Sequence, residues 1–197
     1  MLRPQLSVAR WRTQSSAAYG EPVTSSTPRD QHRGAVYAAE DALARALERG
    51  GSVEFFGSTL TLPIERRFAD VASIQDYVDR VLFVIDPHLL PIIVRERSGA
   101  TKAHYEYPRD ERAGVIAIPL MLQGSRRWAA RESVVLHEIA HHVTHHDPIG
   151  RSEAAHGATF CGHLIALHER VIGPESALML RAAFDAARIP IASVEPA

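Results

Sequence analysis

The segment Val134–His142 contains two histidines and a glutamate whose spacing suits metal chemistry. His137, Glu138 and His141 form the pattern HExxH. On an α-helix, side chains four residues apart lie on one face, so the two imidazoles would project together. Two neutral imidazoles placed in this way can bind one Zn²⁺, and the glutamate can act as general base on a zinc-bound water. We therefore expect His137 and His141 to be metal ligands and Glu138 to be catalytic.

The residues around this pattern predict a buried helix over about residues 128–144. Apolar side chains fill most of the neighbouring positions, namely Val134, Val135, Leu136, Ile139, Ala140 and Val143. Burying three titratable groups within five residues costs free energy unless a partner compensates for the lost water. A metal ion is such a partner, and this favours a metal site over a chance match on a solvated helix.

A catalytic zinc site needs a third protein ligand and leaves the fourth position to water. The best candidate is His156, which follows a helix-breaking segment at residues 147–151 that contains Pro148 and Gly150. We expect a second helix, from a cap at Ser152 to about residue 170, to return towards the first and to carry this ligand.

An ordered set of motifs in this chain resembles known metallopeptidases. HExxH followed by a loop and by His156-Gly157-x-x-Phe160 is similar to the SprT-like group of zincins. From about Arg29 to Arg188 the chain resembles a family of small HExxH metallohydrolases found in actinobacteria and their phages. The matching segments are residues 29–33, 36–40, 53–57, 103–106, 135–142 and 156–160. The resemblance implies a zinc-dependent hydrolase that acts on peptide bonds, and it implies no particular substrate.

Two other interpretations of the motif stay open. His145 extends the pattern to HExxHxxxH, as in regulatory metalloproteases of the ImmA/IrrE type, where a downstream carboxylate is the third ligand; here that carboxylate would be Glu153. A second interpretation is a non-catalytic metal-binding module in which Glu138 only orients a ligand. A metzincin is disfavoured because Thr144 and Asp147 replace the glycine and histidine of that motif.

Other polar residues near the motif have weaker assignments. His142, His145 and His146 are expected to be solvated or to interact with the helix C-terminus. His163 and His168 are expected to lie on the surface or behind the ligands, and His104 or Tyr105 could donate a hydrogen bond to a developing oxyanion.

The composition sets limits on location and partners. The formal net charge is −1, so no global field draws the chain to nucleic acid or to a membrane. One cysteine, Cys161, cannot form an internal disulfide, and no apolar segment is long enough to span a bilayer or to form a signal peptide. We expect a cytoplasmic protein with a peptide or protein substrate. A nucleic-acid-binding arm through Arg3, Arg10 and Arg12 is a less favoured alternative.

Hydrophobic periodicity predicts a minimal zincin-like α+β domain over residues 29–190, between a flexible extension (1–28) and a frayed C-terminus (191–197). Its sheet would have three to five short strands. Expected strands are a hairpin at 52–62 and segments 92–97, 103–107 and 115–119; expected helices, besides the two above, are 30–49, 68–84 and 174–187.

Two expectations concern elements around the site. Pro119 is compatible with an edge position, so the strand at 115–119 is a hypothesis for substrate pairing. The helix at 30–49, with Asp30 as its cap, is expected to pack on the core away from the metal.

Overall fold

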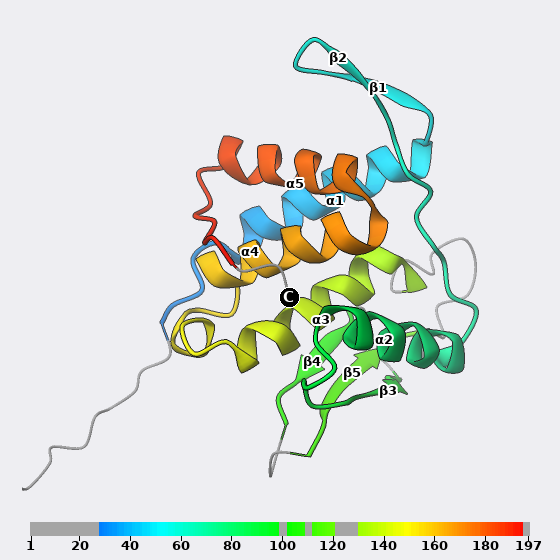
Figure 1. Ribbon diagram of the computed structural model, residues 1–197, viewed down its shortest axis with the longest axis vertical. Helices are drawn as coiled ribbons and strands as arrows, with labels where there is room; N and C mark the ends of the chain where they lie inside the picture. Colours follow the sequence, from blue (N-terminus) through cyan, green and yellow to red (C-terminus); the bar gives the residue numbers. More distant parts are fainter. Residues whose placement is uncertain (1–27, 99–101, 109–111, 121–129, 195–197) are drawn as a thin grey trace, which may run out of the picture.

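The computed structural model describes residues 28–98, 102–108, 112–120 and 130–194 of the 197-residue chain (Figure 1). In these ranges five α-helices accompany two small sheets, so the fold is α+β, as predicted. Arg3, Arg10 and Arg12, and nearly all of the expected N-terminal extension, lie outside the described residues. None of the described helices combines the length and hydrophobicity needed to cross a membrane.

Helix α1 (Arg33–Arg49) buries one apolar stripe, and a glycine caps its C-terminal end. The predicted core positions are buried, namely Val36, Ala39, Leu43, Ala46 and Leu47. Gly50 follows with a φ of 62°, a conformation that glycine adopts without steric cost. Asp30 is not the cap, because the N-cap position is His32 and no side chain caps it.

Helix α2 (Val71–Ile85) begins at a capping box rather than at Phe68. The Asp70 carboxylate accepts the Ser73 N–H at 2.8 Å, and the Ser73 hydroxyl accepts the Asp70 N–H at 3.2 Å. The apolar face of α2 packs on strand β3 (Ile92–Glu96).

The described residues contain five strands at the predicted positions, but these strands form two sheets rather than one. Strands β1 (Ser52–Phe55) and β2 (Ser58–Thr61) pair as an antiparallel hairpin, which projects beyond the helices (Figure 1). Strands β4 (His104–Glu106) and β5 (Gly114–Ile118) join β3 in the order β3-β5-β4.

The central position of β5 corrects the hypothesis about substrate pairing. β5 pairs in parallel with β3 on one side and antiparallel with β4 on the other, so it has no free edge. Its nearly complete burial is what a central strand requires. The sheet edge beside the HExxH helix is formed by β4, and Pro119 only follows the end of β5.

From Glu132 to Ala186 the chain consists of helices joined by short turns. Helix α3 (Glu132–His146) carries the HExxH motif, and α4 (Ala158–Leu167) follows after the 3-10 helix η2 (Gly150–Ser152). The expected helix from Ser152 to about residue 170 is therefore wrong at its start, because α4 begins at Ala158; at its end α4 continues as the π-helical turn η3 (His168–Ile172). Helix α5 (Pro174–Ala186) matches its prediction.

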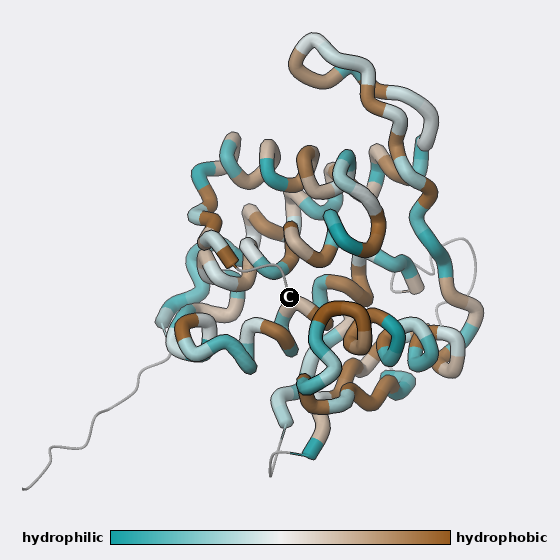
Figure 2. Tube along the Cα trace, in the orientation of Figure 1, coloured by the Kyte–Doolittle hydropathy of each residue, from teal (hydrophilic) through white to brown (hydrophobic). Residues whose placement is uncertain are grey.

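Helix α3 lies at the centre of the molecule, in contact with α4 on one side and with β4 on the other. Hydrophobic residues recur along these helices and along the three-stranded sheet (Figure 2). The largest fully buried side chains come from all of them, including Leu136, Ile139, Phe160, Ile116 and Phe184. Beyond α5, Ala192 donates a hydrogen bond to the Ala158 carbonyl, within the segment expected to be frayed.

Candidate metal centre

The first turn of α3 is held by the segment that precedes α2. The Glu65 carboxylate accepts hydrogen bonds from the Ser133 N–H and hydroxyl, and it pairs with Arg131 at 2.7 Å. This carboxylate satisfies a backbone donor that helix geometry leaves unpaired at an N-terminus. The fully buried Glu132 accepts from the Tyr77 hydroxyl at 2.8 Å and pairs with Arg66. These contacts fix the direction in which α3 presents its histidines.

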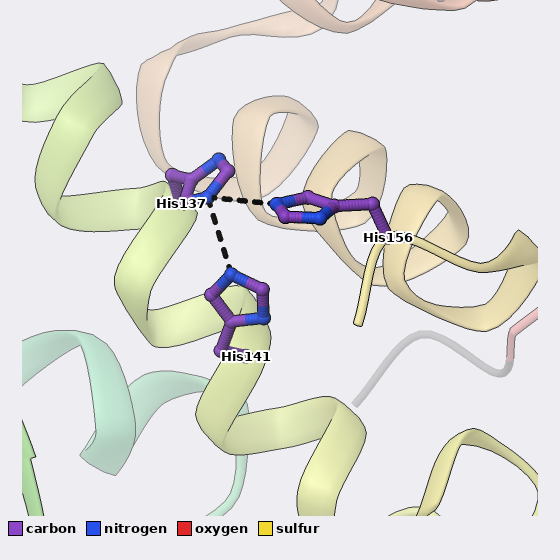
Figure 3. A group of neighbouring side chains, drawn as sticks. All are labelled: His137, His141 and His156. Carbon is purple, nitrogen blue, oxygen red and sulfur yellow. Dashed lines mark hydrogen bonds between the residues drawn. The ribbon is translucent and has the colours of Figure 1, made fainter. Parts of the chain in front are cut away.

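Three imidazoles converge between α3 and the turn before α4 (Figure 3). The Nε2 atom of His137 lies 3.2 Å from that of His141 and 3.4 Å from that of His156. One ligand atom from each of the three histidines lies within 4.8 Å of the others. The structure therefore brings together the three residues that the sequence analysis selected. His156 stands in the turn two residues before α4, not on the helix as expected.

These separations match the dimensions of a tetrahedral zinc site. A Zn–N bond of about 2.0–2.1 Å places two ligand nitrogens about 3.3–3.4 Å apart in tetrahedral geometry. The two Nε2 distances at His137 lie close to that value. Two of the three nitrogen separations in the cluster therefore already suit one ion.

Two carboxylates fix the orientation of two of the imidazoles. The Nδ1 atom of His137 lies 2.9 Å from each oxygen of Glu40, and the Nδ1 atom of His156 lies 2.7 Å from an oxygen of Asp30. An ionised carboxylate only accepts hydrogen bonds, so both Nδ1 atoms carry the proton and donate it. Carboxylates behind the ligating histidines are the usual support of zinc sites.

This protonation pattern leaves the Nε2 lone pairs of His137 and His156 facing each other across 3.4 Å. Neutral rings of these tautomers have no proton to share between the two Nε2 atoms. Two facing lone pairs repel unless a cation lies between them. The donor set and its tautomers therefore fit a divalent metal ion.

Burial favours the neutral form of two of the three imidazoles, those of His141 and His156. Burial lowers the pKa of His141 well below its usual value, and the neighbouring His137 and His156 lower it further when charged. Burial also lowers the pKa of His156, although the hydrogen bond to Asp30 opposes the shift. For His137 burial also lowers the pKa, but the charge and hydrogen bond of Glu40, together with the charge of Glu138, raise it by more, so the net pKa is raised. Neutral imidazole is the form that binds metal.

Glu138 lies beside the cluster on the same helix, and it is 5% exposed. Burial raises its pKa to about 7, while His137 and a hydrogen bond from the Tyr105 backbone oppose the shift. A carboxylate with a pKa near neutrality can both accept and release a proton.

The motif around His156 is explained by packing. The ring of Phe160 contacts the rings of all three histidines, with centroids 4.5–5.1 Å apart. A Cβ atom at Gly157 would lie 2.4 Å from the Glu153 carboxylate, which accepts the Thr159 N–H at 2.9 Å. Glu153 therefore caps α4, and His156 occupies the position that the alternative assignment gave to Glu153.

His142 is buried rather than solvated, which corrects the sequence-based expectation. Its Nε2 donates to the Leu90 carbonyl at 2.8 Å, so its Nδ1 accepts from the Tyr105 hydroxyl at 2.7 Å. A Cβ atom at Gly114 would lie 2.6 Å from that hydroxyl, so glycine makes room for the pair. The Tyr105 hydroxyl is thus committed to His142 and is not an oxyanion donor.

The remaining histidines fall outside the cluster. His145 and His146 are half-buried near the end of α3, and the Nε2 atom of His163 lies 3.2 Å from the Asp147 carboxylate. The fully buried His168 shares a hydrogen bond with the Ser176 hydroxyl at 2.8 Å, so of the two expected positions the surface is excluded. His104 lines the cleft over the cluster.

Two adjoining cavities flank Glu138. One, of about 390 Å³, opens over His141 and His156 and is lined by polar side chains from α1, β4 and the end of β3. The other, of about 280 Å³, lies between α1 and the start of α3, with Tyr37, Ala44, Ala103 and Val134 among its walls. Both cavities therefore border the histidine cluster as well as Glu138.

Sequence reasoning missed the contribution of α1. This helix was expected to lie away from the metal, yet it supplies Glu40, and the preceding segment supplies Asp30. A signal was present: Glu40 falls on the stripe formed by Val36, Leu43 and Leu47 at spacings of four, three and four residues. A carboxylate on an apolar stripe requires a buried partner.

Comparisons with known proteins give no relative: no family model, no curated protein and no solved structure matches this chain.

Proposed function

We propose that this protein is a zinc-dependent metallohydrolase that cleaves peptide bonds, with His137, His141 and His156 as ligands and Glu138 as general base. The observation that carries the proposal is the convergence of three Nε2 atoms at separations of 3.2 and 3.4 Å around His137. Two of the rings are held by carboxylates in the tautomer that ligation needs. The proposal agrees with the resemblance to SprT-like zincins.

The donor set favours zinc over hard cations. Three imidazole nitrogens with no carboxylate in the cluster suit Zn²⁺, whereas Mg²⁺ and Ca²⁺ prefer oxygen ligands. Three protein ligands also leave a coordination position open, as in catalytic zinc sites. When bound, the ion would lower the pKa of a water molecule and polarise the substrate carbonyl.

The residues of the chain would then handle the proton. Glu138 takes a proton from the attacking water and delivers it to the leaving amine. Its raised pKa supports both steps, and a bound dication would shift that pKa downwards towards the value of an efficient base. Glu40 and Asp30 keep the ligand rings in place during the reaction.

The alternatives have less support. Glu153 accepts a backbone N–H of α4, so a regulatory protease with this residue as ligand would require that cap to open. A non-catalytic module does not account for a buried carboxylate beside the open side of the histidine cluster, with cavities on both sides. A cytoplasmic location is proposed from the single buried thiol of Cys161.

The test combines metal analysis with hydrolysis of a quenched fluorescent casein and a mixed peptide library. The purified protein should contain about one zinc per chain. Glu138→Gln should retain the metal and lose hydrolysis by about 10²–10⁴-fold, because only the proton acceptor is removed. Glu169→Gln, at an exposed position on η3, is the matched control and should behave as wild type. Full hydrolysis by Glu138→Gln would refute the assigned role.

A further inference from the structure

Three cationic side chains surround the cleft over the histidine cluster. Arg33 is the first residue of α1, Arg97 follows β3, and Lys102 precedes β4. All three line the same cavity as Glu138 and His156. Segments from three separate parts of the chain therefore bring positive charge to one opening.

These cations differ in their partners from three arginines elsewhere in the protein. Arg66, Arg95 and Arg131 each form an ion pair with a glutamate. Among the described residues, Arg33, Arg97 and Lys102 have no such ion pair. Arg33 and Lys102 instead lie over the Tyr37 ring, at 5.7 and 4.7 Å from its centroid. The aromatic ring positions both charges without neutralising either of them.

The charge balance of the cleft favours an anion. Its described lining has three formal positive charges and two carboxylates, Asp30 and Glu138, which gives a net charge of +1 with His104 neutral. Asp30 is engaged by His156, and a bound divalent ion would add two more positive charges. This contrasts with the formal net charge of −1 for the whole chain. A concave site of one sign focuses the field on its ligand.

The second cavity does not share this character. Lys102 borders this cavity too, but the three carboxylates of Glu40, Asp41 and Glu138 outnumber Lys102 and Arg131, and Arg131 is already paired with Glu65. An acidic group would meet like charge there. The anionic part of a ligand is thus directed to the side of Glu138 that faces His156.

We propose that Arg33, Arg97 and Lys102 form a carboxylate-recognition site that makes acidic peptides the preferred substrates. The proposal rests on the proposed function, whose reacting groups lie in the same cleft. Arg97 and Arg33 can each present a planar fork to a carboxylate, while Lys102 acts as a point charge. The carboxylate belongs either to an Asp or Glu side chain near the cleaved bond or to the peptide C-terminus.

The first experiment measures binding without turnover. Zinc-loaded Glu138→Gln protein is titrated with pairs of fluorescein-labelled peptides that differ only in Glu or Gln at one position, moved in turn along an alanine-rich heptapeptide. At one or more positions the Glu peptide should bind about 5–20-fold tighter in low salt, and the difference should shrink as salt screens the cleft. Equal binding of every pair overturns the proposal, as does an absence of binding by all acidic peptides.

The second experiment assigns the preference to residues. Arg97→Gln and Lys102→Gln, each combined with Glu138→Gln, should reduce the Glu-to-Gln affinity ratio towards one. Arg181→Gln, an exposed position on α5 with the same change in charge, should leave the ratio unchanged. Arg97→Glu should reverse the preference in favour of a Lys peptide. A ratio that persists in both cleft variants contradicts the assignment.

The third experiment identifies the source of the carboxylate. Each peptide is compared as the free acid and as the C-terminal amide. A preference lost on amidation assigns the site to the chain terminus, whereas a preference that follows the Glu position assigns it to a side chain. If zinc-loaded wild-type protein binds acidic peptides with this pattern but cleaves none of them, the hydrolase function fails and carboxylate recognition stands.

Discussion

His141 and His142 are consecutive residues of α3, yet their surroundings differ in kind. The Nε2 atom of His141 faces that of His137 at 3.2 Å, within a group of three imidazoles. Both nitrogens of His142 are hydrogen-bonded to neutral protein groups, Tyr105 and Leu90. In the described part of the chain, His141 has only another imidazole of the cluster as its hydrogen-bond partner, whereas both nitrogens of His142 are paired with groups outside the cluster.

The comparison shows that burial alone does not identify a ligand. His142 is fully buried, whereas His141 is partly exposed, yet His141 belongs to the cluster. What distinguishes the ligands is the unmatched Nε2 lone pair, which a carboxylate behind the ring enforces at His137 and His156. Substitutions in the histidine cluster should therefore change metal affinity, whereas substitutions around His142 should change stability.

The largest effect is expected at the cluster itself. His156→Ala should weaken zinc binding by about 10³-fold or more, since a site with two imidazoles loses a large part of its binding free energy. Competition with a chromophoric chelator measures the affinity. His163→Ala, on α4 and outside the cluster, is the matched control. Unchanged affinity in His156→Ala would remove this residue from the site.

The carboxylates behind the rings should have the next largest effect. Glu40→Gln and Asp30→Asn should each reduce zinc affinity by about 10–100-fold, because the ligand ring loses its charged hydrogen-bond partner. The same chelator competition applies. Asp41→Asn, which neutralises the next carboxylate on α1, is the control. Among the described residues Asp41 forms no hydrogen bond with a ligand histidine, so this variant should have little effect. Equal losses in Asp41→Asn and Glu40→Gln would indicate a general charge effect instead.

His142, whose two ring nitrogens are both hydrogen-bonded, should influence stability and not metal content. Tyr105→Phe leaves the buried Nδ1 of His142 without its donor, so we expect the free energy of unfolding to fall by about 1–3 kcal/mol. Urea denaturation of the metal-free protein measures this change, with the exposed Tyr107→Phe as control. Loss of zinc by Tyr105→Phe with unchanged stability would show that His142 belongs to the site.

A smaller, pH-dependent effect is expected from another histidine that binds no metal. Burial lowers the pKa of His168 to about 4 in the native state, against about 6.5 in the unfolded chain. The neutral ring therefore stabilises the fold above pH 6.5, and this contribution is lost as the pH falls towards 4. Metal-free protein should lose about 2 kcal/mol between pH 7.5 and 5 through this residue.

Urea denaturation across that pH range provides the check. His168→Gln should show a shallower decline of unfolding free energy with falling pH than the wild type. His88→Gln, at an exposed position, should retain the wild-type slope. Parallel slopes for all three proteins would exclude His168 as a source of acid sensitivity.

Local patterns were sufficient for much of this molecule. The spacing of His137 and His141, the apolar residues around them and the nearby His-Gly-x-x-Phe segment selected the three histidines that the structure brings together. Helix α1 was predictable because its apolar period is regular and glycine follows it. These features depend on residues that are close in sequence.

Features that depend on contacts between residues distant in sequence could not be predicted from such local patterns. Whether β5 is central depends on β3 and β4 pairing on its two sides, and strand composition does not specify its neighbours. Asp30 looked like a helix cap because a carboxylate before a helix usually is one. Its actual partner, His156, lies 126 residues away, and no local pattern connects them.

That separation has a consequence for when the site comes into being. A growing chain that has emerged only as far as α3 holds His137 and His141 but neither the third ring nor a partner for Asp30. The histidine cluster is complete only after the turn before α4 has been synthesised and has folded back onto α1. Any metal binding by all three histidines would thus wait for the synthesis of His156, and the bound ion would then link α3 to a turn that also contacts the segment before α1.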